Sequence, residues 1–176
     1  MSSPPQKPEE KPEEKQGEKL EEQMKQAMRR LGASVTVVTS HDGDQRYAMT
    51  ATAVTSLSLE PPALLICVNR INGLYSALSK GHGFCVNILF NDQQEISDSC
   101  ARKSEGGDKF ENGDWLTGKD NIPYLANAQA SVFCDLDDSH DYGSHTIFIG
   151  KITEIISRDD IAPLMFLAGN YFSHTA

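Results

Sequence analysis

Residues 47–62 read Tyr47-Ala48-Met49-Thr50-Ala51-Thr52-Ala53-Val54-Thr55-Ser56-Leu57-Ser58-Leu59-Glu60-Pro61-Pro62, an alternating segment with unusually small side chains. Alternation of this kind predicts a β-strand whose successive side chains point to opposite faces. A strand that faces solvent normally carries Lys, Glu or Arg, whereas the polar positions here are hydroxyls. This surface suits a flat polar ligand, because no long side chain keeps a ring away from the backbone. An ordinary half-buried strand is the alternative.

The length and the charge of the chain limit its class. The chain has 176 residues and a formal net charge of -9, from 16 Lys plus Arg against 25 Asp plus Glu. This length suits one domain that buries roughly two-thirds of its unfolded surface. The acidic balance argues against nucleic acid and anionic membranes as partners. The apolar runs are shorter than the roughly 20 residues of a membrane helix, and the N-terminus lacks the apolar segment of a secretion signal. We therefore expect a soluble, cytoplasmic protein.

The cysteines and histidines are scattered along the chain. The four cysteines form no C-x-x-C pair and stand at Cys67, Cys85, Cys100 and Cys134. Three of them lie in apolar strand-like runs, so we interpret them as small buried side chains that need no disulfide. His140 and His145 have no third ligand of the usual type nearby, so we expect no metal site.

The N-terminal part predicts a tail followed by a helix. Residues 1–19 contain no large apolar side chain beyond Met1, and such a segment does not offset its ordering entropy, so we expect a disordered tail. The next apolar residues recur at helical spacing, at Leu20, Met24, Ala27, Met28 and Leu31, and Gly32 would end the helix. We expect this amphipathic helix to pack on a domain that spans residues 20–176.

The remainder of the chain predicts a mainly β domain. Strand candidates span 34–39, 47–59, 63–69, 83–90, 130–135 and 145–156. Short helices are expected over 72–80, capped by Asn72, over 92–101, with Asp92 and Glu95 as a capping box, and from 160 to 167. Many strands, few helices and no repeated βα unit favour a closed or partly closed antiparallel barrel. The G-x-G-x-x-G loop of a Rossmann fold is absent.

Seven short motifs follow one another between residues 24 and 172. They are 32–39 GASVTVVT, 49–62 MTATAVTSLSLEPP, 67–69 CVN, 84–89 FCVNIL, 108–110 DKF, 143–150 GSHTIFIG and 169–171 GNY. In this order they resemble the flavin reductase-like domain family, which includes the small reductase components of two-component flavin-dependent monooxygenases. The resemblance implies a mainly β, antiparallel Greek-key split β-barrel with a few short helices, the FMN-binding split barrel, usually as a homodimer. It also implies FAD or FMN as the flavin and NADH or NADPH as the reductant.

The same resemblance implies residues that contact the flavin. The strand 49–56 and the segments 67–69 and 84–87 would lie along the flavin, and Ser76 would reach phosphate from the first part of its helix. Lys109 resembles the basic residue of the family's D-R-F motif, with an exposed loop lysine as the alternative. The implied flavin contacts are Met49, Thr50, Ala51, Thr52, Thr55, Ser56, Cys67, Val68, Asn69, Ser76, Phe84, Cys85, Val86, Asn87, Lys109 and Phe110.

His145 and Tyr171 match family positions beside the nicotinamide and are the catalytic candidates, and Ser34 is a further candidate on that side. A strand-end histidine, a core tyrosine and a plain strand start are the alternatives. Ser144 stands where the family commonly has aspartate, which bears on the strength or nucleotide preference of this site. Direct hydride transfer requires two rings stacked about 3 to 3.5 Å apart and no acid–base dyad.

We therefore predict an NAD(P)H:flavin oxidoreductase that reduces FAD or FMN and releases it to a separate flavin-dependent oxygenase. About 155 residues leave room for the reductase barrel only, so oxygenation would belong to another protein. One alternative is a non-catalytic flavin-binding or electron-carrier protein of the same fold. Another is a structural or interaction barrel that has lost flavin.

Overall fold

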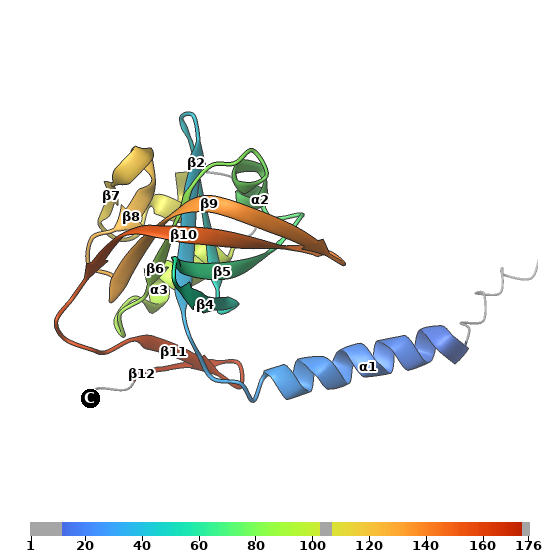
Figure 1. Ribbon diagram of the computed structural model, residues 1–176. Helices are drawn as coiled ribbons and strands as arrows, with labels where there is room; N and C mark the ends of the chain where they lie inside the picture. Colours follow the sequence, from blue (N-terminus) through green and yellow to red (C-terminus); the bar gives the residue numbers. More distant parts are fainter. Residues whose placement is uncertain (1–11, 103–106, 174–176) are drawn as a thin grey trace, which may run out of the picture.

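The computed structural model describes residues 12–102 and 107–173 (Figure 1). Its centre is a seven-stranded sheet with the order β3-β2-β6-β9-β10-β5-β4, in which every pairing is antiparallel. The strands are β2 Thr36–Asp42, β3 Gln45–Ala51, β4 Val54–Leu59, β5 Pro62–Asn69, β6 Phe84–Ile88, β9 Ala130–Tyr142 and β10 His145–Ser157. The predicted mainly β, antiparallel fold is confirmed.

The sheet is a barrel that stays open between its two edge strands. β3 and β4 follow each other in the sequence, yet β3 pairs only with β2, and β4 only with β5, in the described part of the chain. The chain crosses between them through Thr52 and Ala53, which belong to neither strand. The prediction of one continuous strand over 47–59 was therefore wrong. We call this crossing, residues 50–56, the seam.

Two large apolar clusters and a small third one, of Cys85, Ile122 and Phe133, stabilise the barrel. The first fills its interior beneath helix α2 (Gly73–Leu78), with Ile66, Phe84 and Phe148 fully buried. The second includes residues of helix α3 (Gln94–Ala101) and is centred on Val37, Leu89, Cys100, Phe110 and Leu125. Burial of this apolar surface stabilises the fold by roughly 25 cal/mol per Å² removed from water.

The cysteines are free thiols, as predicted. Cys85, Cys100 and Cys134 are buried, and Cys67 is partly exposed. Burial raises the pKa of Cys100 and of Cys134 to about 12, so both remain protonated thiols that behave as small apolar side chains.

The two short helices begin differently. The Asn72 side chain accepts a hydrogen bond from the Leu74 amide at 3.0 Å, so the predicted cap of α2 is confirmed. The predicted capping box of α3 was wrong, because the helix begins at Gln94, after the N-cap Gln93. The Gln93 side chain instead accepts from the Phe90 amide and donates to the Asn127 carbonyl.

The C-terminal segment forms strands where a helix was predicted. β11 (Leu164–Leu167) pairs with β12 (Asn170–Ser173) and with β1 (Ala33–Ser34) in a three-stranded sheet. The turn between β11 and β12 has positive φ at Ala168 (55°) and Gly169 (88°), the geometry of a two-residue hairpin. The sequence did not predict four further short elements, of which β7 and β8 form a separate two-stranded sheet: η1 Gly107–Phe110, β7 Trp115–Thr117, η2 Lys119–Asn121 and β8 Pro123–Leu125.

Helix α1 (Pro12–Met28) includes residues 12–19, so the prediction of disorder there was wrong. Proline is favourable at the first helical position, and Glu, Lys and Gln are strong helix formers. Residues 1–11 of the predicted tail lie outside the described residues. Within the described ranges, the structure contains no helix of the length and apolar composition needed to cross a membrane.

Helix α1 projects away from the barrel (Figure 1), so the prediction that it packs on its own domain was wrong. Its apolar residues remain exposed, with 67% of Leu20, 63% of Met24, 53% of Met28 and 68% of Leu31 accessible to solvent. The cause is the anchor at its C-terminal end, where the Ala168 amide donates to the Arg29 carbonyl at 2.9 Å. This contact fixes the end of α1 on the β11–β12 hairpin.

Candidate functional site

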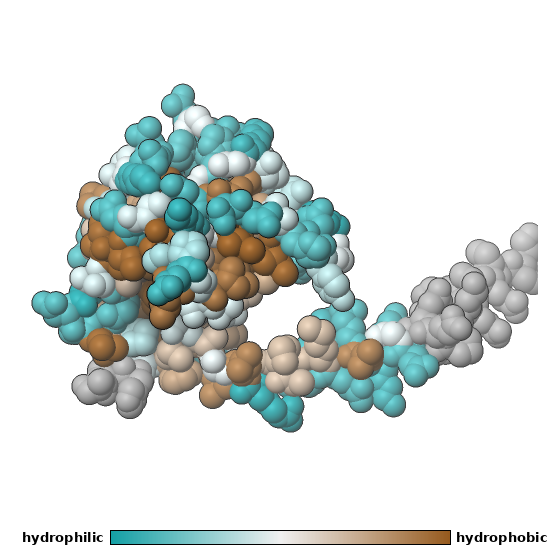
Figure 2. All heavy atoms as spheres, in the orientation of Figure 1, coloured by the Kyte–Doolittle hydropathy of each residue, from teal (hydrophilic) through white to brown (hydrophobic). Residues whose placement is uncertain are grey.

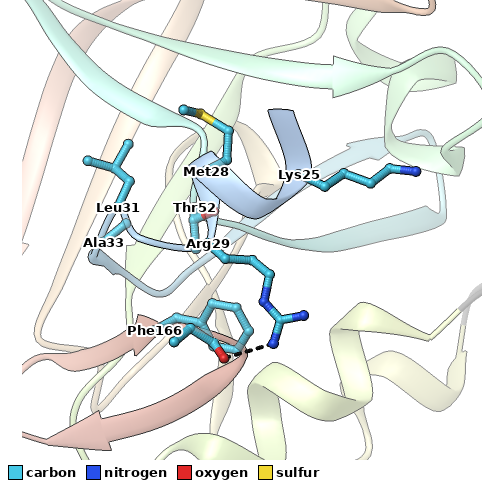
Figure 3. A pocket seen from close by; sticks show the side chains of 8 residues that line it. Lys25, Met28, Arg29, Leu31, Ala33, Thr52 and Phe166 are labelled. Atoms are coloured by element: carbon cyan, nitrogen blue, oxygen red, sulfur yellow. Dashed lines mark hydrogen bonds between the residues drawn. The ribbon is translucent and has the colours of Figure 1, made fainter. Parts of the chain in front are cut away.

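Three pockets meet at Thr52 in the centre of the seam. The barrel pocket, of about 420 Å³, opens into the barrel and is lined by Ser34, Thr36, Val54, Thr55, Ser56, Leu64, Val86, Ile88, Val132, Ile152 and Ile155 with Ala33 and Thr52. The helix pocket, of about 320 Å³, lies between Thr52, the end of α1 and β11 (Figure 3). The tyrosine pocket, of about 240 Å³, contains Thr50, Ala51, Ser97 and Tyr171. Ligand pockets in proteins typically span roughly 300 to 1,000 Å³, a range that these adjoining pockets reach.

Two threonine hydroxyls fix the start of the seam. Thr36 Oγ1 donates to the Ala51 carbonyl at 2.7 Å, and Thr50 Oγ1 donates to the Ser97 carbonyl at 2.6 Å. Within the described residues, the amides of Thr52 and Ala53 donate to no protein group. The seam therefore offers a ligand two backbone donors beside small side chains.

Strands β5 and β10 bring further predicted residues next to the seam. The Cys67 amide donates to the Ala53 carbonyl at 3.1 Å, and Asn69 pairs with His145 across the two strands. Residues two apart on a strand share a face, so Cys67, Asn69 and His145 lie on one partly exposed face of the sheet. Val68 points to the opposite face and is fully buried.

His145 begins β10 and is held by its own neighbour. Ser144 Oγ lies 2.9 Å from His145 Nδ1, so serine does orient the imidazole in place of the family's usual aspartate. The turn is fixed from β5, because the Arg70 amide donates to the Ser144 carbonyl at 3.0 Å and the Arg70 guanidinium to the Gly143 carbonyl.

Tyr171 lies in the tyrosine pocket and does not share the face that carries His145. Its hydroxyl is 2.9 Å from Ser97 Oγ and donates to Asp98 Oδ1 at 3.0 Å. Burial raises the pKa of the Tyr171 phenol, which keeps it a neutral hydrogen-bond donor. The three predicted nicotinamide contacts therefore lie at three separate places within one subunit. His145 is on the β5–β10 face, Tyr171 is in the tyrosine pocket, and Ser34 is in the barrel pocket.

Several predicted flavin contacts belong to the core. β6 is paired on both sides, with β2 and β9, and Phe84, Cys85 and Asn87 are fully buried. They line none of the three pockets at Thr52, and their predicted contact with flavin stays a prediction. Met49 and Val68 are core side chains as well, whereas Val86 reaches the barrel pocket.

Lys109 and Phe110 anchor the segment after α3. Lys109 Nζ donates to the Ala48 carbonyl at 2.8 Å, and only 8% of the residue is exposed. Burial lowers the pKa of the Lys109 ammonium. Lys109 is therefore not an exposed loop lysine, and its predicted flavin contact stays a prediction. Phe110 is buried under the Arg46 guanidinium, which lies 4.3 Å from the ring centroid, and its predicted flavin contact stays a prediction.

Ser76 is half-buried on α2, and its carbonyl accepts a hydrogen bond from the Ser79 hydroxyl. It lines none of the three pockets at Thr52. In the described ranges, no group of three His, Cys, Asp or Glu side chains is placed to hold a metal ion.

Sequence reasoning missed the residues of the helix pocket. Its walls include Lys25 and Met28 from α1, Arg29 from the turn after it, and Phe166 from β11. A signal was present in the sequence, because the acidic N-terminal segment ends in three cations, Lys25, Arg29 and Arg30. The position of Lys25 and Arg29 in the pocket that contains Thr52 depends on the β11–β12 hairpin, which the sequence did not predict.

Known proteins share this fold and this sequence pattern. The flavin reductase like domain matches residues 28–175. The chain is 39% identical over 145 residues to the reductase component of the FADH(2)-dependent resorcinol hydroxylase of Rhizobium sp., which covers 81% of each chain. It is 32% identical over 141 residues to the NADH-dependent FMN reductase RutF of Pseudomonas syringae pv. syringae, which covers 80% of this chain and 79% of the relative.

A solved structure agrees with these relatives. The Streptomyces globisporus NADH:FAD oxidoreductase SgcE6, solved with NAD and FAD fragments, superposes with a TM-score of 0.82 at 29% identity. The match covers 88% of this chain and 92% of that chain.

Proposed function

The chain belongs to the flavin reductase-like domain family, and we propose that it is the NADH-dependent flavin reductase of a two-component monooxygenase. It reduces FAD or FMN and supplies the reduced flavin to a separate oxygenase. The observation that carries this proposal is the seam, where Thr52 and its small neighbours stand at the meeting point of three pockets.

The seam fits a flavin in both shape and chemistry. No side chain between Thr50 and Ser56 is longer than valine, so a planar ring can approach the backbone. The amides of Thr52 and Ala53 can donate to the carbonyl and nitrogen acceptors of the ring. The proposed flavin contacts in this region are Thr50, Ala51, Thr52, Thr55, Ser56, Cys67 and Asn69.

The protein contributes positioning rather than acid–base chemistry. A bound flavin accepts a hydride from the nicotinamide of NADH, a step that needs close ring stacking and fixed polar groups. His145, whose Nδ1 is engaged by Ser144, would orient the nicotinamide carboxamide through Nε2. Tyr171, held by Ser97 and Asp98, would contact the ligand from the tyrosine pocket. Val54, Leu64 and Ile152 would exclude water on the barrel side.

Steady-state turnover tests the function. The full chain, with NADH and excess FAD or FMN in air, should oxidise NADH over many turnovers per subunit, measured at 340 nm. NADPH in place of NADH gives the nucleotide preference. Tight flavin binding without turnover would favour a flavin carrier, and the absence of flavin binding would favour a barrel that has lost this ligand.

A homodimer is the second part of the proposal. Helix α1 exposes Leu20, Met24 and Met28, and an isolated helix of this length is only marginally stable in water. Figure 2 shows apolar surface along α1 and on the barrel body that it faces. The barrel pocket supplies an apolar surface that the helix of a second copy can cover, and two identical contacts of this kind close a twofold dimer.

Met24→Glu should convert the dimer into a monomer at micromolar concentration, because it places a charge in the apolar face of α1. Gln26→Glu is the matched control, since it adds the same charge to the opposite face of the same helix. Analytical ultracentrifugation distinguishes the two forms. A wild-type monomer, or equal effects of the two variants, would contradict the proposed interface.

We also propose that the protein works in the cytoplasm. Its four cysteines are free thiols, which is typical of a reducing compartment, and NADH is the proposed reductant.

A further inference from the structure

The helix pocket combines two cations with an apolar wall. Lys25 lies in the last turn of α1 and Arg29 directly follows the helix, with its amide bonded to the Lys25 carbonyl, and Figure 3 shows Arg29 extending beside Phe166. Met28 and Leu31 provide further apolar surface. The pocket continues to Thr52 and Ala33, both of which also line the barrel pocket. The two pockets therefore adjoin, and a ligand on the seam can extend directly into the helix pocket.

Arg29 is held in place by the β11–β12 hairpin. Its guanidinium Nη2 donates to the Ala168 carbonyl at 3.0 Å, and the Ala168 amide donates to the Arg29 carbonyl at 2.9 Å. Gly169 makes room for this arrangement, because a Cβ at that position would lie 2.8 Å from Nη2. One nitrogen of the guanidinium is thus used for positioning, while Nε and Nη1 can bind an anion.

Lys25 adds a second positive charge one turn earlier. It pairs with Glu21 at 2.6 Å on the exposed side of α1, and exposed pairs of this kind contribute little free energy. An anion can therefore recruit the ammonium at small cost. On a chain with a net charge of -9, two cations beside the seam reverse the local field where an anionic ligand would enter.

We infer that the helix pocket binds the adenosine diphosphate half of a dinucleotide. Lys25 and Arg29 bind the pyrophosphate, and the Phe166 ring and Met28 pack against the adenine. This inference rests on the proposed function, since it places the reacting ring of the same ligand on the seam. FAD and NADH both carry this half, whereas FMN and riboflavin do not.

Flavin binding by Lys25→Gln and Arg29→Gln variants tests the inference. The quenching of flavin fluorescence gives the dissociation constants of FAD, FMN and riboflavin for the full chain, without NADH and therefore without turnover. If FAD occupies the pocket, each variant should weaken FAD binding about tenfold and leave riboflavin binding unchanged. Arg29→Lys should recover most of the loss. Arg30→Gln is the matched control, because it removes the same charge from a side chain that does not line the helix pocket.

Binding of ADP-ribose shows whether the pocket holds the ADP half of NADH or that of FAD. If NADH occupies the pocket, ADP-ribose binding, measured by calorimetry, should weaken about tenfold in the same variants while FAD binding stays unchanged. The inference fails if both ligands bind the variants as they bind the wild type. It also fails if Arg30→Gln weakens ligand binding as much as Arg29→Gln does. A third contradicting result would be that Ser76→Ala weakens FAD binding while the Lys25 and Arg29 variants do not. Riboflavin lacks the ADP half, so the reduction of riboflavin by the variants tests the proposed function independently of this inference.

Discussion

Replacing Thr52 with tryptophan will abolish flavin binding and leave the fold intact. Thr52 is exposed and lies where all three pockets meet, so an indole at this position fills the space that a planar ligand would occupy. It belongs to no strand, and its side chain contributes to none of the three core clusters. The substitution therefore removes no buried contact and no ladder hydrogen bond.

The expected change is a loss of flavin affinity of more than a hundredfold, with the free energy of unfolding within about 0.5 kcal/mol of the wild type. Fluorescence titration measures the first quantity and urea denaturation the second. Thr117→Trp is the control, because it makes the same substitution on an exposed strand position of β7. Normal flavin binding by the Thr52 variant would show that the ring does not lie on the seam.

The fold class could be predicted from the sequence because local pattern determines it. The strand candidates 63–69 and 145–156 are largely apolar segments, and the structure reproduces both almost to the residue. The break at Thr52 could not be predicted, because alternation continues through it and only the pairing partners change, from Thr36 with Ala51 to Ile66 with Val54. Pairing partners are a tertiary property that one sequence does not display.

The helix predictions failed where tertiary contacts decide the structure. The segment 160–167 was expected to be helical, but Phe166 pairs with Ala33 and Tyr171 in the three-stranded sheet. Tertiary pairing overrides local propensity there. Helix α1 was placed correctly from Leu20 onward, but its surroundings were not, because spacing identifies an apolar face and not the surface that covers it.

The candidate site also has a part that local sequence identifies and a part that depends on strand pairing. Residues 50–56 could be identified as a candidate ligand surface because the signal, small side chains in a strand-like segment, is local. The sequence could not show whether the segment 84–87 lines the ligand site or belongs to the core. A core strand and a strand beside a ligand both appear in sequence as apolar runs with occasional polar residues. Only the pairing of β6 on both sides shows that Asn87 faces the interior.

Asn87→Ala will destabilise the barrel by about 3 to 5 kcal/mol, the largest stability change that we expect from a single side-chain truncation. Asn87 Nδ2 donates to the Val37 carbonyl at 3.0 Å and to Thr39 Oγ1 at 3.2 Å. Its Oδ1 accepts from the Leu125 amide at 2.9 Å and from Ser131 Oγ at 3.0 Å. Truncation leaves these buried groups without partners and adds a cavity in the same place.

Urea denaturation measures this loss, and the midpoint should fall while the slope stays constant. Asn127→Ala is the matched control, because Asn127 is exposed and its side chain makes one long hydrogen bond, to Asp114 at 3.3 Å, so the change should stay within about 0.5 kcal/mol. The fraction of Asn87→Ala protein that remains folded should bind flavin with wild-type affinity, since Asn87 joins β2, β6, β9 and the Leu125 amide inside the barrel and touches no pocket at the seam. Unchanged stability together with lost flavin affinity would instead place the ligand against β6, as the sequence alone had suggested.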